Sequence, residues 1–141
     1  MDCPLCALPS ELVLWEDERC RVIRVDDAAH PGFCRVVWGE HVGEMTDLSP
    51  ADRRHLLDVV MATEAALRNL LDPDKINLAS FGNMVPHLHW HVIARFDWDS
   101  HFPQAVWGPR QREVRPDALQ RIGMALAELD ACVVEALSAA G

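Results

Sequence analysis

Three of the seven histidines stand close together, at His87, His89 and His91, and large apolar residues separate them. Successive side chains of a β-strand point to opposite faces, so this spacing places the three imidazoles on one face if the segment is a strand. A helix would spread them over more than half of its circumference. Neutral imidazole is a good nucleophile near pH 7 and can also exchange protons. The spacing therefore predicts a catalytic strand rather than a merely polar strand face.

The three imidazoles are not equivalent in such a strand. At about 3.3 Å of rise per residue, His89 and His91 lie about 6.6 Å apart along the backbone, and His87 lies about 13 Å from His91. His89 and His91 can therefore act on one small group, whereas His87 and His91 cannot easily meet. The opposite face is apolar and is expected to pack in the core: Leu88, Trp90, Val92 and Ala94.

The run from His87 to Ile93 resembles the His-φ-His-φ-His-φ-φ motif of the histidine triad (HIT) family, in which φ is apolar. The resemblance extends from about Cys3 to Gly108, and Pro86 before the triad is similar to a bacterial subgroup of the family. It implies an α+β, HIT-like fold with a mostly antiparallel sheet of about five strands and one long crossing helix. It also implies a homodimer that binds a nucleotide.

The resemblance further implies a nucleotidyl hydrolase or transferase that acts at the α-phosphorus of a nucleoside-phosphate conjugate, of the dinucleoside polyphosphate or nucleoside phosphoramidate type. His89 is expected to attack and form a covalent nucleotidyl-histidine, while its other ring nitrogen donates to a backbone carbonyl. His91 is expected to hydrogen-bond the phosphate or a leaving-group oxygen. Asp26 is the expected contact of the ribose, and Asn77 and Asn83 are the expected contacts of the phosphate.

Two positions depart from the family pattern. Phe33 stands where many members have a histidine, and Met84 stands where a Ser or Thr usually provides a hydroxyl. His30 is near Phe33 in the sequence, but we do not expect it to take over that role. These departures keep a second interpretation open, a nucleotide-binding regulatory protein with weak or no catalysis. A third is a metal-dependent hydrolase, because His-x-His on a strand also forms half of some catalytic metal centres.

Cys3 and Cys6 form a Cys-x-x-Cys pair, which by itself fits a redox pair, half of a metal site or a chance occurrence. In zinc-containing HIT proteins, the other two ligands are a histidine after the third strand and the first histidine of the triad. These places correspond to His41 and His87. The resemblance therefore implies a structural zinc site with two thiolates and two imidazoles. No catalytic metal is expected, because the motif supplies no carboxylate pair to hold one.

Length and charge limit the remaining possibilities. A chain of 141 residues fits one compact domain, residues 1–141, with its core at about 3–108 and a helical extension at about 116–140. The formal charge of −9 disfavours non-specific binding to polynucleotides. No apolar run approaches the ~20 residues of a membrane span, and the first residues do not resemble a signal peptide. Five cysteines, an odd number, argue against a secreted disulfide framework, so a cytoplasmic location is expected.

Local patterns predict the elements that position the histidines. Strands are expected at residues 12–15, 20–25, 33–38 and 76–81. Ser49 as N-cap and Pro50 at the first helical position predict a long helix that ends near Leu71. A C-terminal amphipathic helix is expected from Pro116 onward, with its apolar stripe reaching Leu137. The aromatic loop at 97–109 is expected to cover the core rather than to stack on a base.

Overall fold

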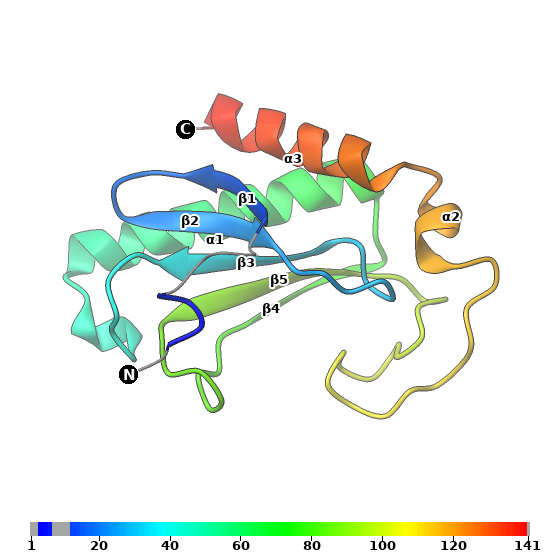
Figure 1. The fold of residues 1–141 in the computed structure, drawn as a ribbon, viewed down its shortest axis with the longest axis horizontal. Coiled ribbons are helices and arrows are strands. Elements are labelled where there is room, and N and C mark those ends of the chain that lie inside the picture. Colours follow the sequence, from blue (N-terminus) through cyan, green and yellow to red (C-terminus); the bar gives the residue numbers. More distant parts are fainter. Residues whose placement is uncertain (1–2, 7–11, 141) are drawn as a thin grey trace.

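The computed structural model describes residues 3–6 and 12–140 of the chain. Its centre is a five-stranded sheet in the order β1-β2-β3-β5-β4, in which all neighbouring strands are antiparallel (Figure 1). The strands are β1 (Leu12–Glu16), β2 (Cys20–Arg24), β3 (Phe33–Trp38), β4 (Lys75–Ala79) and β5 (His89–Arg95). The predicted α+β fold is therefore confirmed, and four of the strands lie within about two residues of the predicted ranges.

Helix α1 (Pro50–Leu71) begins where the sequence predicts. The Ser49 hydroxyl accepts a hydrogen bond from the Asp52 backbone N–H at 3.1 Å, which satisfies a donor of the first turn. The helix ends at Asp72, which adopts a left-handed conformation with φ of 46°. A short 3-10 helix, η1 (Met45–Asp47), precedes it. None of the described helices is both long enough and apolar enough to cross a membrane.

The C-terminal segment differs from the single helix that was predicted. It forms α2 (Ala118–Ile122) and α3 (Leu126–Ala140), and the break between them lies at Gly123. Gly123 has a φ of 76°, a conformation that glycine adopts readily and that ends α2. The apolar stripe continues across the break, so periodicity alone did not reveal it.

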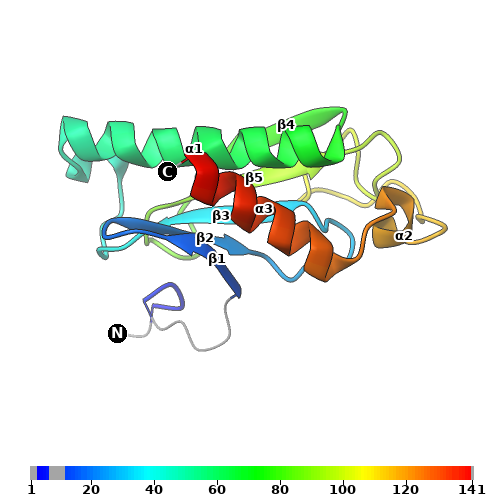
Figure 2. The ribbon, with the colours of Figure 1, turned by 90° about the horizontal axis from the view of Figure 1, so that it is seen from above.

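Helices α1 and α3 cover one face of the sheet (Figures 1 and 2). The main core lies between them and the sheet, and its apolar side chains include fully buried residues of strands and helices alike: Val22, Cys34, Val36, Leu56, Val60, Leu67, Val92, Leu129 and Val133. The face of β5 that was predicted to be apolar points into this layer, with Leu88 and Val92 in the core and Trp90 packed against it. Burial of this apolar area is the main stabilising term of the fold.

No helix of the described residues covers the other face of the sheet. The N-terminal segment of residues 3–6 lies on that side (Figure 2), where a smaller apolar cluster joins it to β2 and β3 through Cys3, Leu5, Ile23 and Val37. The alternating side chains of β5 that point away from α1 begin with His89 and His91. The fold thus places the histidines on the uncovered face, next to the N-terminal segment.

Candidate functional site

The triad strand begins later than the sequence predicts. Strand β5 starts at His89, so His87 lies before the strand instead of on the same regular face. Its ring is held by a separate contact, because Nε2 lies 2.5 Å from the Trp38 carbonyl oxygen and donates to it. His89 and His91 remain neighbours on one face, with ring centroids 4.9 Å apart. The structure thus separates the first histidine from the other two.

His89 has a fixed tautomer in this arrangement. Its Nδ1 lies 2.6 Å from the backbone carbonyl oxygen of His87, and since a carbonyl only accepts, Nδ1 must carry the proton. Burial lowers the pKa of His89, and Arg35 lowers it further, although the hydrogen bond to His87 opposes this. The neutral ring therefore keeps a lone pair on Nε2. The predicted donation of one ring nitrogen to a backbone carbonyl is confirmed.

His91 is neutral near pH 7. Burial, together with the neighbouring His89 and the positive charge of Arg35, lowers the pKa of His91 to about 4. Its Nδ1 is buried and has no hydrogen-bond partner among the residues that the structure describes. Buried polar atoms are normally paired, so an unpaired one beside a cavity marks a place where a ligand can bond.

His89 and His91 line a cavity of about 410 Å³, a size that suits a small organic ligand. Its lining comes from the N-terminal segment, from β3 and β5, from the β4–β5 turn and from the loop after β5: Pro4, Leu5, Arg35, Phe81, Gly82, Asn83, Met84, Val85, His89, His91 and Trp107. Asn83, one of the predicted phosphate contacts, is among them. Met84 is also among them and is 95% exposed.

The other two predicted substrate contacts lie elsewhere. Asn77 is on β4, opposite Ile93, and its side-chain oxygen accepts a hydrogen bond from Arg95 Nη1 at 2.8 Å. Asp26 is exposed just beyond the end of β2. Neither is among the described residues that line the cavity. Of the three predicted contacts, the structure brings only Asn83 to the two histidines.

Several lining residues were not predicted from the sequence, among them Arg35, Phe81 and Trp107. Arg35 lies directly opposite His91 in the ladder between β3 and β5. Strand alternation places Arg35 on the same face as Phe33, but the pairing with His91 depends on a register that the sequence does not reveal.

Aromatic rings surround His91. The centroid of the Trp107 ring lies 4.8 Å from that of His91, and the rings of Phe33 and Phe81 lie 5.8 and 6.1 Å away. Trp107 is 51% exposed, so the prediction that the aromatic loop only covers the core is wrong at this residue. It holds better for Trp98, which stacks on Phe96 at 4.7 Å.

The loop that carries Trp107 is fastened by a buried ion pair. Arg95 donates to both carboxylate oxygens of Asp99, at 2.9 and 3.1 Å, and to the Gln104 carbonyl at 2.7 Å. Burial opposes the ionisation of Asp99, but contacts with His30 and Arg95 hold its pKa well below the ordinary value. His30 belongs to this network, 3.6 Å from Asp99, and does not line the cavity.

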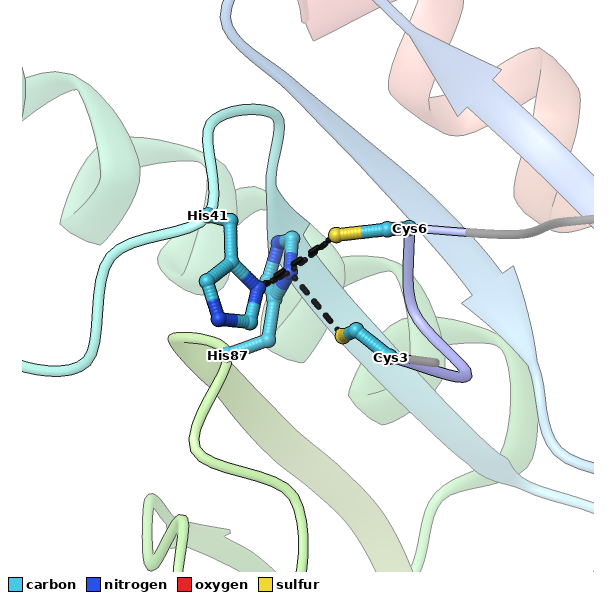
Figure 3. A group of neighbouring side chains, drawn as sticks. All are labelled: Cys3, Cys6, His41 and His87. Atoms are coloured by element: carbon cyan, nitrogen blue, oxygen red, sulfur yellow. Dashed lines mark hydrogen bonds between the residues drawn. The ribbon is translucent and has the colours of Figure 1, made fainter. Parts of the chain in front are cut away.

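A second cluster of side chains lies just before the start of β5, where Cys3, Cys6, His41 and His87 meet (Figure 3). The His87 Nδ1 atom lies 3.5 Å from Cys3 Sγ, 3.4 Å from Cys6 Sγ and 3.2 Å from His41 Nδ1. Cys6 Sγ and His41 Nδ1 are 3.3 Å apart. The segments that meet here are far apart in the sequence, yet all four donor atoms converge on one point.

The donor set and its spacing fit zinc. With zinc–nitrogen bonds of about 2.0 Å and zinc–sulfur bonds of about 2.3 Å, a tetrahedron separates two nitrogens by about 3.3 Å and a nitrogen from a sulfur by about 3.5 Å. The separations in the cluster are 3.2 Å and 3.3–3.5 Å. Because His87 Nε2 donates to Trp38, its Nδ1 keeps the lone pair that a metal needs. These four residues are compatible with a closed zinc site.

Comparisons with known proteins give one consistent family. The HIT domain profile matches residues 9–98. A histidine triad protein from Marinobacter aquaeolei has 28% identity and a TM-score of 0.74, with 93% of this chain and 91% of that chain covered. A histidine triad protein from Bradyrhizobium japonicum has 26% identity and a TM-score of 0.71, with 90% of this chain and 97% of that chain covered. Among curated proteins, none matches the chain.

A third solved structure is similar in fold. It is a zinc-bound histidine triad family protein from Mycobacterium smegmatis, with 23% identity and a TM-score of 0.67, and the match covers 99% of this chain and 98% of that chain. The profile match includes β5 and its two cavity-facing histidines. The chain therefore belongs to the histidine triad family.

Proposed function

We propose that the protein is a nucleotidyl hydrolase or transferase that cleaves a nucleoside-phosphate conjugate at the α-phosphorus. The observation that carries this proposal is the hydrogen bond from His89 Nδ1 to the His87 carbonyl. It fixes the tautomer in which Nε2 has a free lone pair, and the lowered pKa keeps that lone pair unprotonated near pH 7. The nucleophile is thereby prepared before a substrate arrives.

In the proposed reaction, His89 Nε2 bonds to the α-phosphorus and the bond to the leaving group breaks. The product is a covalent nucleotidyl-His89, which water hydrolyses in a second step. His91 hydrogen-bonds a phosphate or leaving-group oxygen through a ring N–H, and Asn83 offers its side-chain amide from the rim. Asp26 and Asn77 stay predictions as substrate contacts, because a bound nucleotide would have to extend beyond the described cavity lining to meet them.

We also propose that Cys3, Cys6, His41 and His87 hold a structural zinc ion. The donor geometry supports this, and so does the zinc-bound relative of the same fold. Zinc there would hold the N-terminal segment against the start of β5. His87 would then have two separate tasks, with its ring on the metal and its carbonyl on His89. No metal is assigned to the reaction itself.

The proposed assembly is a homodimer. Leu57 and Met61 are exposed on α1, and Leu78 is exposed on the edge strand β4. Edge strands and exposed apolar side chains are common components of subunit interfaces. Sedimentation of the purified protein checks this proposal, and a mass of one chain would contradict it.

A nucleotide-binding regulatory protein with weak or no catalysis is the second candidate. The ring of Phe33, in the place of a common active-site histidine, lies 5.8 Å from that of His91, and Met84 offers no hydroxyl. Turnover with a panel of nucleotide conjugates separates the two candidates. A protein that binds nucleotides and never turns them over would be the regulator.

The test of the proposed function is the His89→Ala variant. It should abolish turnover and change nucleotide affinity by less than about tenfold, because the work of His89 is covalent. Mass spectrometry of quenched wild-type reactions should reveal the nucleotidyl adduct, and the variant should show none. His55→Ala, a histidine on the opposite side of the sheet in α1, serves as the matched control. A His89→Ala rate of a tenth of wild type or more would reject the assignment.

A further inference from the structure

Arg35 has an unusual place for a charged side chain. It lies directly across from His91 in the β3–β5 ladder and lines the cavity. Directly paired residues of antiparallel strands have Cβ atoms about 4.5–5.5 Å apart, so the side chains of Arg35 and His91 leave the sheet side by side. Its central carbon lies 5.9 Å from the centre of the Phe33 ring, which places the charge over an aromatic face.

This charge has no equivalent elsewhere in the cavity. Of the described residues that line it, Arg35 alone carries a permanent positive charge. The chain as a whole has a formal charge of −9, so its overall field repels an anionic ligand. A guanidinium binds phosphate oxygens through a planar pair of donors. Arg35 is therefore the group in the cavity that is best suited to a phosphate.

The leaving group decides what the site must supply. When His89 Nε2 bonds to the α-phosphorus, the electron pair of the broken bond stays with the leaving atom. A phosphate oxygen leaves as an anion and needs only a compensating positive charge. An amine nitrogen must instead gain a proton, which requires a general acid with a pKa near the working pH.

The described lining of the cavity offers a permanent positive charge but few groups that could donate a proton near pH 7. His91 is the imidazole next to the nucleophile, and burial with the charges of its neighbours keeps it unprotonated near pH 7. A neutral imidazole can donate a hydrogen bond, but it is a weak proton donor. Arg35, directly opposite His91 in the ladder, supplies a positive charge without giving up a proton.

We infer that Arg35 binds the phosphate that leaves, and that the substrate is a nucleoside polyphosphate conjugate, cleaved at a phosphoanhydride, rather than a phosphoramidate. This inference rests on the proposed function and narrows its substrate class. The bond from α-phosphorus to bridging oxygen breaks, the bond from α-phosphorus to His89 Nε2 forms, and Arg35 compensates the new charge on the departing phosphate. Arg35 is thus a catalytic residue.

The experiment compares two substrates that share the adenylyl group, diadenosine triphosphate and adenosine 5′-phosphoramidate. The wild type should have the higher kcat/KM with diadenosine triphosphate. Arg35→Gln should lower kcat/KM for that compound by about a hundredfold or more, the usual effect of losing one charge-stabilising donor, and for the phosphoramidate by less than tenfold. Arg35→Lys should recover part of the loss, and the exposed Arg19→Gln should behave as wild type.

Each other outcome has a defined meaning. Equal losses with both substrates would place Arg35 on the transferred phosphate and overturn the inference, as would no loss with either. A wild type that forms the adduct only from the phosphoramidate would overturn the inference and leave the proposed function intact. A wild type that cleaves neither compound and forms no adduct would overturn both. Thermal unfolding of Arg35→Gln within about 3 °C of wild type excludes a loss of fold as the cause.

Discussion

The two ends of β5 are fastened to the rest of the molecule in different ways. Just before the strand, the ring of His87 meets Cys3, Cys6 and His41. At its last residue, Arg95 pairs with the Asp99 carboxylate. Both ends tie the strand to a segment that forms a wall of the cavity. The first holds the N-terminal segment with Pro4 and Leu5, and the second holds the loop with Trp107.

The difference lies in where the positive charge comes from. Arg95 brings its own guanidinium, so the Arg95–Asp99 end is complete within the chain. The four donors at the other end offer lone pairs to one point, and a metal cation would join them. One wall of the cavity is therefore a fixed property of the chain, and the other would depend on metal supply and on pH once zinc binds as proposed. Both ends belong to the strand whose first residue, His89, carries the proposed chemistry.

The largest effect is expected from Asp99→Ala. Asp99 is 1% exposed and also accepts hydrogen bonds from the backbone N–H groups of His101 and Phe102. Removing one partner of a buried ion pair leaves the other charge uncompensated, so the free energy of unfolding should fall by about 3–5 kcal/mol. Urea denaturation measures this loss. The matched control is Asp97→Ala, an exposed neighbour whose loss should cost less than about 0.5 kcal/mol. A loss below about 1 kcal/mol for Asp99→Ala would show that this end is not an independent fastening.

A smaller effect is expected from removing the metal at the other end. Protein purified without chelator should contain about one equivalent of zinc, and Cys3→Ser/Cys6→Ser should contain less than a tenth. With free zinc about a hundredfold above its Kd, binding stabilises the fold by about 2.7 kcal/mol. A strong chelator should therefore lower the Tm of the wild type and of the control Cys132→Ser, and leave the double variant unchanged. Less than a tenth of an equivalent in the wild type would reject the site.

The contacts at the two ends of β5 should be lost at different pH values as the solution is acidified. Thiolates and imidazoles release zinc as they take up protons, so zinc and its share of stability should be lost as the pH falls from 7 toward 4. The pKa of Asp99 is depressed in the folded state, so its contribution is present above its unfolded pKa of about 3.9 and is lost only as the pH falls through the lower, folded value. Zinc release and unfolding followed together should therefore show the metal leaving first. Full zinc retention at pH 4 would contradict this order.

Treatment with EDTA tests whether the proposed reaction needs a metal. A brief treatment at neutral pH should leave turnover intact, because no metal takes part in the proposed chemistry. Activity that disappears and returns with Mg²⁺ or Mn²⁺ alone would favour a metal-dependent hydrolase instead.

The smallest effect is expected from Asn77→Ala. The structure gives its side chain to Arg95, so its loss should cost about 1 kcal/mol of stability, as for a single hydrogen bond. Nucleotide affinity measured beside it decides whether Asn77 also contacts the substrate, and a change of less than about threefold would leave it with the structural role alone. Asn69→Ala on the exposed side of α1 is the control. If affinity fell tenfold or more while stability stayed unchanged, Asn77 would be a substrate contact after all, as the family pattern implies.

Short-range features were predictable from the sequence. The start of α1 depends on Ser49 and Pro50, which act on backbone groups within one turn. Strand positions followed from alternation and β-branched residues. The break at Gly123 was missed, although it is also local. The apolar stripe continues through it, and only the positive φ of Gly123 reveals where α2 ends.

Long-range contacts were predicted only where the family resemblance implied them. The Cys3–His87 contact joins residues 84 positions apart and was expected only through the family resemblance. The Arg35–His91 and Arg95–Asp99 pairs were not expected, because strand register and loop path arise from tertiary packing. The hydrogen bond from Arg95 to the Asn77 side chain was likewise not expected, since the resemblance gave no partner for Asn77 within the chain.

The size of the cavity has a consequence for selectivity. Its volume of about 410 Å³ lies near the lower end of the range for small-ligand sites. Phe81 and Met84 at its edge are 59% and 95% exposed. A conjugate with two nucleosides exceeds this volume, so its far half is expected to extend beyond the described lining. Discrimination would then stop at the phosphate that Arg35 is inferred to bind. We expect the protein to treat as equivalent all conjugates that differ only beyond that phosphate, and so to act on a chemical class instead of a single metabolite.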